Sequence, residues 1–344
     1  MAGEPGPEPR RLRRRRRLIL AGVAAGLAIA GVVLLLGKAA GYAKVLDHLR
    51  SADPRWIGVA VAGEALAFDG YVVALRETFR FERGPDLGLR SSAHLVFAWL
   101  GAARLLAAGG AGGIAMSYWG LTKAGADKHE AAARLLAANT LIFGFFGAAT
   151  WIAALSLLGQ TPGHAPLHLV LPWLLAVPAF LAGVVWFRAP AWHHRLPGRV
   201  GRSASTMLVD AAAGVAVVRR LVSAPRTAAV TLVAVALYWA GDAVCLWAGL
   251  LAFDVRLDAG RLVLAYSTGY LFTLLPLPLG GVGGVDAAMA VTVSAVGVPL
   301  AAAILGVLAY RVVNFWLPTP FGIVAFTTAE RLGRRLEARV RARS

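Results

Sequence analysis

The sequence predicts an all-α protein, a polytopic transmembrane bundle of about 6–8 spans with glycine-broken helical hairpins in an inverted repeat. Residues of the AVILMFWYC set make up 58% of the 344 residues and charged residues only 15%. Soluble proteins are roughly 45–50% apolar even when glycine is counted. The mean hydropathy of +0.66 agrees with this excess. The chain therefore has too little polar surface for a soluble shell, and its solvent must be lipid.

Six apolar stretches are long enough to cross a membrane, which takes about 20 residues because lipid offers the backbone no hydrogen-bond partner. They cover residues 18–37, 56–75, 131–158, 167–187, 227–253 and 300–326. The first follows a basic head, as a secretory signal does, but further spans follow it, so we expect an uncleaved anchor. Pro162, Gly163 and Pro166 predict a short turn between the third and fourth of these spans.

Basic residues gather in three segments beside the apolar stretches. Seven arginines lie in residues 1–17, seven in 188–226 and six in 331–344, within a net charge of +17. Short cytoplasmic loops retain Lys and Arg, so the pattern predicts a plasma-membrane protein with both termini in the cytoplasm. The segments contain a single aromatic residue, Trp192, which argues against nucleic acid as a partner. Anionic phospholipid headgroups are the expected partners of the basic tails.

The domain organisation follows from these segments. We expect a basic cytoplasmic tail over residues 1–17 and a second one over 331–344. Between them, residues 18–330 form a single transmembrane domain with halves of about 18–187 and 227–330. Residues 200–226 alternate apolar and basic positions and predict an amphipathic helix along the inner surface.

Two further apolar stretches, residues 92–121 and 262–297, are interrupted by matching glycine clusters that recur 171 residues apart. The first cluster is Gly109, Gly110, Gly112 and Gly113, and the second is Gly280, Gly281, Gly283 and Gly284. Glycine costs about 1 kcal/mol in a helix interior and permits a turn, so the clusters predict helices that break inside the bilayer. The alternative is that these glycines only allow close helix packing.

The distribution of arginines favours a hairpin over residues 92–121. With the amino terminus inside, the loop from Arg76 to Arg90 is also inside, and a single crossing would place the basic 188–226 loop outside. A hairpin that enters and returns keeps that loop inside. Residues 262–297 can either re-enter from the outer face or cross twice. Two broken helices of opposite orientation predict an alternating-access site near the midplane.

Few ionisable residues lie within the apolar stretches, and each needs a partner or a wet cavity. Arg104 precedes the first glycine cluster, and we expect it either to hold a lipid phosphate beside the next helix start, to snorkel, or to pair with Glu64. Asp242 is expected to be a satisfied buried acid. Glu64 and Asp69 lie about 140° apart on one helix, so these two do not form a paired-carboxylate site.

The second half carries three candidates. Asp286 follows Gly284 in a first helical turn, where it either caps the helix or acts in function. Arg311 and Asn314 share a helix face at i,i+3, and Pro318 with Pro320 predicts a break or kink beyond them. An ion pair between Asp286 and Arg311 would be either structural or the pair that substrate exchange opens.

Three segments resemble the flippase-like membrane family that includes the transmembrane domain of lysylphosphatidylglycerol synthases. They are GGAGGIAMSYW at residues 109–119, LPLPLGGVGGVD at 275–286 and YRVVNFWLP at 310–318. The likeness spans roughly residues 18–330. It implies a polytopic lipid-translocating module with the glycine clusters and Arg311 in the functional region. No appended soluble domain that could make an aminoacyl lipid is found, so synthase activity is not implied.

The function expected from these observations is a flippase or transporter of a phospholipid or lipid-linked substrate, not an enzyme, with a lipid-modifying enzyme as a partner. The alternatives are a membrane-embedded transferase acting on a lipid and an accessory subunit. No cofactor is expected, because the chain has no G-x-x-x-x-G-K-[ST] loop, a single cysteine, and no H-E-x-x-H motif for a metal. The predicted substrate site comprises Arg104, both glycine clusters, Asp286, Arg311 and Asn314.

Overall fold

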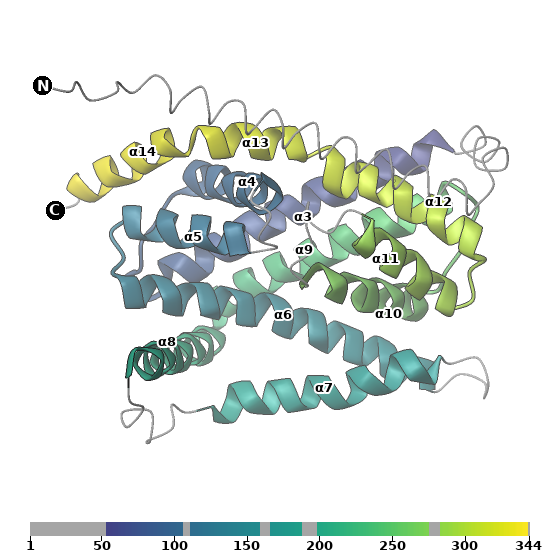
Figure 1. Ribbon diagram of the computed structural model, residues 1–344, viewed down its shortest axis with the longest axis horizontal. Helices are drawn as coiled ribbons and strands as arrows, with labels where there is room; N and C mark the ends of the chain where they lie inside the picture. The colour runs from purple at the N-terminus through teal and green to yellow at the C-terminus, as the bar shows by residue number, and fades with distance from the viewer. Residues whose placement is uncertain (1–52, 106–110, 159–165, 188–197, 275–282, 343–344) are drawn as a thin grey trace, which may run out of the picture.

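The computed structural model describes residues 53–105, 111–158, 166–187, 198–274 and 283–342, and within them the chain is helical without β-strands (Figure 1). Five segments are long and apolar enough to cross a membrane: Pro54–Arg83, Lys128–Leu158, Leu167–Trp186, Pro225–Leu251 and Leu300–Thr327. They confirm five of the six predicted spans and the all-α polytopic class. The predicted 18–37 span, the 1–17 tail, and Pro162 and Gly163 of the predicted turn lie outside the described residues.

These spans are built from helices whose ends the sequence marks. Asp53 caps the first, because its Oδ1 accepts a hydrogen bond from Arg55 N at 2.9 Å and Pro54 opens the first turn. The last span is interrupted by a π-helical turn and by Pro318, which confirms the predicted break. The elements of the spans are α3 (Pro54–Arg80), η1 (Phe81–Arg83), α6 (Lys128–Leu158), α7 (Leu167–Trp186), α9 (Pro225–Leu251), α12 (Leu300–Arg311), η5 (Val312–Trp316) and α13 (Thr319–Thr327).

Helices α3 and α9 cross at glycines, so that their backbones touch. A Cβ at Gly63 would lie 2.8 Å from Gly241 O, and one at Gly70 would lie 2.5 Å from Ala234 O. Small residues at a membrane helix interface let backbones approach this closely. The crossing also places the next residue of each helix, Glu64 on α3 and Asp242 on α9, toward the centre of the bundle.

We expect Gly70→Ala to destabilise the protein by about 1–3 kcal/mol, because the new methyl group meets backbone atoms that cannot move without separating α3 from α9. Gly58→Ala on the same helix is the matched control, since a Cβ there meets nothing within 4 Å. That control should be neutral or stabilising by up to about 1 kcal/mol through helix propensity. Thermal unfolding of the purified protein in detergent checks both, and equal melting temperatures for the two variants would contradict the close crossing.

The first glycine-rich stretch forms a helical hairpin. Helix α4 (Leu89–Leu105) and helix α5 (Ala111–Lys123) run antiparallel, because Gly113 lies against Trp99 and Gly120 lies against Leu95. At 17 and 13 residues they are about 26 and 20 Å long, short of the roughly 30 Å hydrocarbon core. The predicted break in 92–121 is thus confirmed, while Gly109 and Gly110 themselves lie outside the described residues.

The second glycine-rich stretch is broken in the same way. Helix α10 (Ala259–Tyr270) with η3 (Leu271–Leu274) packs on α11 (Gly284–Ala295), and Gly269 lies against Met289 and Thr292. The two α-helices have 12 residues each, or about 18 Å, which favours re-entry over two crossings. Gly280 and Gly281 lie outside the described residues. Figure 1 shows this hairpin at the opposite end of the long axis from α4 and α5.

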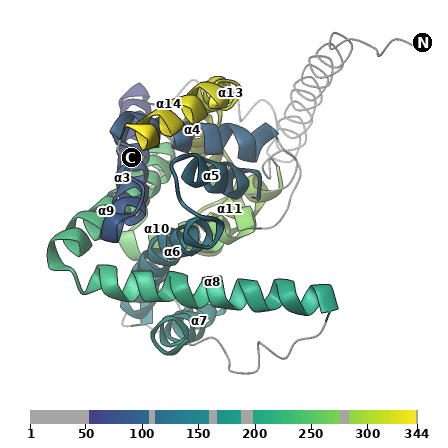
Figure 2. The same cartoon turned by 90° about the vertical axis from the view of Figure 1, so that its left-hand side faces the viewer.

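Helix α8 (Gly198–Val222) lies across one end of the bundle. It is seen end-on in Figure 1 and lengthwise in Figure 2, perpendicular to α6. Arg220 Nε bonds Glu82 Oε2 at 2.8 Å, and His129 Nδ1 bonds Asp210 Oδ1 at 2.9 Å, so α8 is fixed to η1 and to the start of α6. The predicted helix over residues 200–226 is present and runs along a surface at this end.

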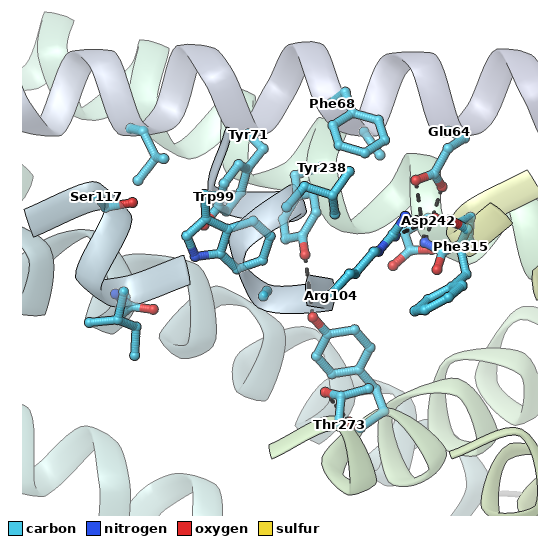
Figure 3. Close-up of a pocket in the computed structure, with 18 of the residues that line it drawn as sticks. Glu64, Phe68, Tyr71, Trp99, Arg104, Ser117, Tyr238, Asp242, Thr273 and Phe315 are labelled. Atoms are coloured by element: carbon cyan, nitrogen blue, oxygen red, sulfur yellow. Dashed lines mark hydrogen bonds between the residues drawn. The ribbon is translucent and has the colours of Figure 1, made fainter. Parts of the chain in front are cut away.

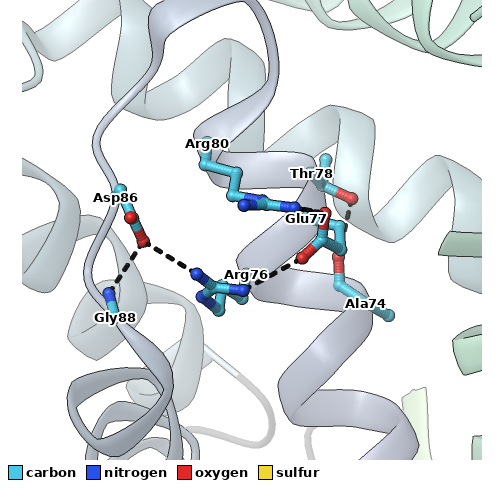
Figure 4. Close-up of polar contacts among 7 residues, drawn as sticks. All are labelled: Ala74, Arg76, Glu77, Thr78, Arg80, Asp86 and Gly88. Carbon is cyan, nitrogen blue, oxygen red and sulfur yellow. Dashed lines mark hydrogen bonds and ion pairs between the residues drawn. The ribbon is translucent and has the colours of Figure 1, made fainter. Parts of the chain in front are cut away.

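The loop that joins α3 to α4 at the same end is held by a polar cluster (Figure 4). The buried carboxylate of Glu77 accepts from Arg76 Nη1 at 3.2 Å and from Arg80 Nε at 2.8 Å. Arg76 Nη2 also lies 3.5 Å from Asp86 Oδ1, which in turn accepts from Gly88 N at 2.9 Å. Glu77 thus anchors two of the arginines that the sequence assigns to a cytoplasmic loop.

The basic carboxyl-terminal tail also folds at this end, as helix α14 (Ala329–Arg341). Leu332 and Leu336 recur at helical spacing and are buried, so one face packs on the bundle. Lys123 Nζ, at the end of α5, donates to Glu337 Oε1 at 2.5 Å. That hydrogen bond and the ammonium charge lower the pKa of Glu337 below its ordinary value. The tail is therefore attached to the first hairpin.

Candidate functional site

A cavity of about 280 Å³ lies in the middle of the bundle. Residues of α3, α4, α5, α6, α9, α10, η3, α12 and η5 line it, so both hairpins and four of the five spans contribute side chains. Helices α5 and α11 begin near the middle of the long axis and extend from there toward opposite ends (Figure 1). The volume of the cavity is close to the roughly 300 Å³ lower limit for ligand pockets. The cavity therefore suits one polar headgroup and not a whole phospholipid.

Two buried carboxylates from different spans share one amide at the polar end of the cavity (Figure 3). Asn314 Nδ2 donates to Asp242 Oδ1 at 2.9 Å and lies 3.3 Å from both oxygens of Glu64. Asp242 Oδ2 also accepts from Tyr266 Oη at 2.6 Å. Glu64 and Asp242 are only 6% and 2% exposed. These carboxylates meet because α3 and α9 cross at the glycines directly before them.

Arg104, in the last turn of α4, extends into the cavity and holds the turn that follows α12. Its Nη1 donates to Phe315 O and to Thr319 Oγ1, and its Nη2 donates to Asn314 O at 3.2 Å. Its guanidinium carbon lies 4.1 Å from the centre of the Phe315 ring. Among the described residues Arg104 forms no ion pair with Glu64, although the two charges attract each other across the cavity.

Arg311, at the end of α12, forms the predicted ion pair with Asp286. Its Nε contacts Asp286 Oδ1, and the other carboxylate oxygen of Asp286 accepts from Gly283 N at 2.9 Å. Asp286 therefore both caps α11 and pairs with Arg311, which joins the second hairpin to the last span. The Nη2 atom of Arg311 is buried and has no hydrogen-bond partner among the described residues. A buried cationic N–H group without an acceptor is costly, so this atom is suited to bind an anion.

A π-helical turn presents these groups to the cavity. In η5, Leu317 N donates to Val312 O at 2.9 Å, an i→i+5 bond that widens the helix. Arg311, Asn314 and Phe315 all line the cavity from this region, while Val312 faces outward. Phe315 lies beside both arginines, because the Arg311 guanidinium carbon is 4.6 Å from its ring centre. Single π turns occur often at functional sites.

One wall of the cavity is formed by aromatic side chains (Figure 3). Tyr71 of α3 lies between Trp99 of α4 and Tyr238 of α9, with ring centres 5.6 and 5.0 Å apart. Tyr238 Oη is 3.4 Å from Tyr270 Oη. Ser117 of α5 is buried and lines the cavity beyond Trp99. An aromatic wall with a polar end is suited to an amphipathic ligand.

The structure brings together part of the predicted site. Arg104, Arg311 and Asn314 line the cavity, and Asp286 contacts Arg311. Four predicted glycines are described and do not line the cavity; they are Gly112, Gly113, Gly283 and Gly284. The sequence did not predict that Trp99 and Phe315 line the cavity. It also did not predict that the carboxylates of Glu64 and Asp242 lie next to each other. One feature of the sequence could have indicated that these two acids lie together, since each directly follows a glycine in its span.

The family of the chain is shown by its sequence. Residues 19–322 match the family model described as the lysylphosphatidylglycerol synthase TM region. A comparison with curated protein sequences finds no match. The matched residues include both hairpins and every charged side chain described above at the cavity. The chain therefore belongs to the family of the lysylphosphatidylglycerol synthase transmembrane region and is a multi-pass membrane protein.

Proposed function

We propose that this member of the family moves a phospholipid or lipid-linked substrate across the bilayer, with the polar headgroup in the central cavity and the acyl chains in lipid. The observation that carries the proposal is the buried Nη2 of Arg311, which lacks an acceptor among the described residues while Arg104 lies beside the same Phe315 ring. Guanidinium groups bind phosphate through charge-assisted hydrogen bonds. Two of them at one cavity support a phosphate-bearing headgroup.

The hairpins supply the mobile parts in this proposal. Each is shorter than a full crossing and is joined to the last span by polar contacts, Arg104 with η5 and Arg311 with Asp286, and by the packing of α4 on α13 and of α11 on α12. In this proposal one hairpin shifts against the last span while the other remains closed. The proposed action is thus transport by alternating access and not covalent chemistry.

The orientation proposed for the plasma membrane places the end with α8 and α14 in the cytoplasm. The loop arginines around Glu77 and the helices α8 and α14 all lie at that end. Retention of basic residues on the inner side supports this orientation and attraction to anionic headgroups there. A lipid-modifying enzyme that supplies the substrate from the cytoplasmic leaflet is the proposed partner.

The test is translocation of acyl-labelled phospholipids in liposomes that contain the purified protein, read as the fraction accessible to a membrane-impermeant quencher. Wild type should exceed empty liposomes for at least one headgroup. Arg104→Gln should lower the rate about 10- to 100-fold, because a hydrogen bond to a charged group contributes roughly 1.5–3 kcal/mol.

Arg335→Gln is the control for that variant, since Arg335 is an exposed arginine of α14. No translocation above empty liposomes for anionic, zwitterionic and aminoacylated lipids alike would refute the proposed function. A wild-type rate in Arg104→Gln would remove Arg104 from it.

A further inference from the structure

We propose that Glu64, Asp242 and Asn314 form a proton-binding site, in which one carboxyl group carries a proton that couples headgroup translocation to pH. This inference rests on the proposed function for its coupling step, but the proton site itself stands on the geometry of the described residues. It concerns a ligand other than the lipid and a part of the cavity other than the two arginines.

The two carboxylates have no direct cationic partner in the part of the chain that the structure describes. Within the described residues, no Lys, Arg or His nitrogen forms an ion pair with Glu64 or Asp242, whereas Arg311 is engaged by Asp286. Their only shared donor is the neutral amide of Asn314. Two ionised carboxylates that are buried this close to each other repel and lose their hydration, so the favoured state carries one proton between them.

The net charge of the whole site also favours one bound proton. When all are ionised, the guanidinium groups of Arg104 and Arg311 face the carboxylates of Glu64, Asp242 and Asp286, which leaves one negative charge in the middle of the bundle. One proton on the acid pair brings this sum to zero. Because a net charge at the centre of a bilayer is costly, the neutral state is the one that can change conformation.

The remaining polar groups that face the pair are hydrogen-bonding groups. Tyr266 of α10 donates to Asp242, and the hydroxyl of Tyr310 on α12 and the thiol of Cys245 on α9 lie near the pair. Tyr238 and Tyr270 complete the surroundings on the aromatic side. Asp242 thus accepts hydrogen bonds from Tyr266 and Asn314 and has the Tyr310 hydroxyl beside it, whereas among the described residues Glu64 has only the longer contacts with Asn314. The proton therefore belongs on Glu64.

The coupling step is a simple exchange. Water on one side of the membrane supplies a proton to the Glu64 carboxylate, which becomes a neutral carboxylic acid. The cavity then closes to that side and opens to the other side of the membrane, where the carboxylic acid of Glu64 returns the proton to water. Translocation should therefore slow as pH rises, by up to about tenfold for each pH unit over the range where the proton is lost.

The experiment compares wild type, Glu64→Gln and Asp69→Asn in liposomes, with translocation measured from mildly acidic to mildly alkaline pH. Asp69 is the matched control, since it lies on the same helix but is exposed and outside the cavity. Wild type and Asp69→Asn should share one pH slope, and Glu64→Gln should lose it. A flat wild-type profile, or an unchanged slope in Glu64→Gln, would overturn the coupling.

A second measurement does not depend on transport. Infrared spectra of the purified protein at neutral pH should contain the C=O stretch of a protonated carboxyl group, which Glu64→Gln removes and Asp69→Asn retains. Asp242→Asn serves as a second variant if Glu64→Gln does not fold, and melting temperatures establish folding. Absence of the band from wild type would overturn the proton site even if lipids are moved. A protein that shows the band but moves no lipid would refute the proposed function and the coupling, and leave the proton site standing.

Discussion

Arg311→Met is expected to destabilise the protein by about 3–5 kcal/mol and to abolish translocation. The substitution removes the guanidinium group but leaves Asp286 buried, at 6% exposure, without its ion-pair partner. It also removes the Nη2 group that we assign to the lipid phosphate. Thermal unfolding in detergent and the liposome assay measure the two effects separately.

The double variant Arg311→Met with Asp286→Asn separates structure from function. An asparagine can still accept the hydrogen bond from Gly283 N, and no unpaired charge remains, so most of the lost stability should return. Translocation should not return, because the phosphate has lost its cation. Recovery of transport together with stability would show that the ion pair is purely structural, the alternative that the sequence leaves open.

Gly113→Leu should lower the translocation rate strongly while costing about 1–3 kcal/mol of stability. A Cβ at Gly113 would lie 2.5 Å from Trp99 Cδ1 and even closer to Trp99 Nε1. The larger side chain must therefore push the indole of Trp99, which lines the cavity, or separate α4 from α5. The liposome assay measures the loss, and melting temperatures show that the variant is folded.

Gly183→Leu is the control for this prediction. Gly183 lies in α7, and a Cβ there meets nothing within 4 Å, so the same added side chain should leave transport and stability near the wild-type values. Wild-type transport in Gly113→Leu would mean that the α4–α5 packing and the position of Trp99 do not matter to the cavity.

Most of the fold could be predicted from the sequence because lipid imposes simple constraints. Five apolar stretches of span length appear as helices, since no other regular structure satisfies the backbone there without closing a barrel. Both breaks could be predicted because glycine clusters interrupt otherwise continuous apolar stretches. The first hairpin also follows from the arginines at residues 188–226, which require an even number of crossings before them, whereas the sequence leaves the second stretch open between re-entry and two crossings.

The cavity could be predicted only in part. Arg104, Arg311 and Asn314 were identifiable as polar residues in apolar segments, and the Asp286–Arg311 pair as opposite charges near helix ends. The Glu64–Asp242 pair could not be found by comparing positions on one helix, because it arises where two helices cross. The crossing point depends on which glycines face each other, and this is a property of packing between segments far apart in sequence.

A thiol block tests whether a lipid headgroup passes through the cavity between the hairpins, as we propose. In a Cys245→Ala background, Ser117→Cys places a single reactive thiol on the cavity wall, while Ser223→Cys places one on the exposed turn after α8. Reaction with a bulky maleimide should stop translocation in Ser117→Cys and leave it unchanged in Ser223→Cys. Full translocation by completely labelled Ser117→Cys protein would contradict passage through this cavity.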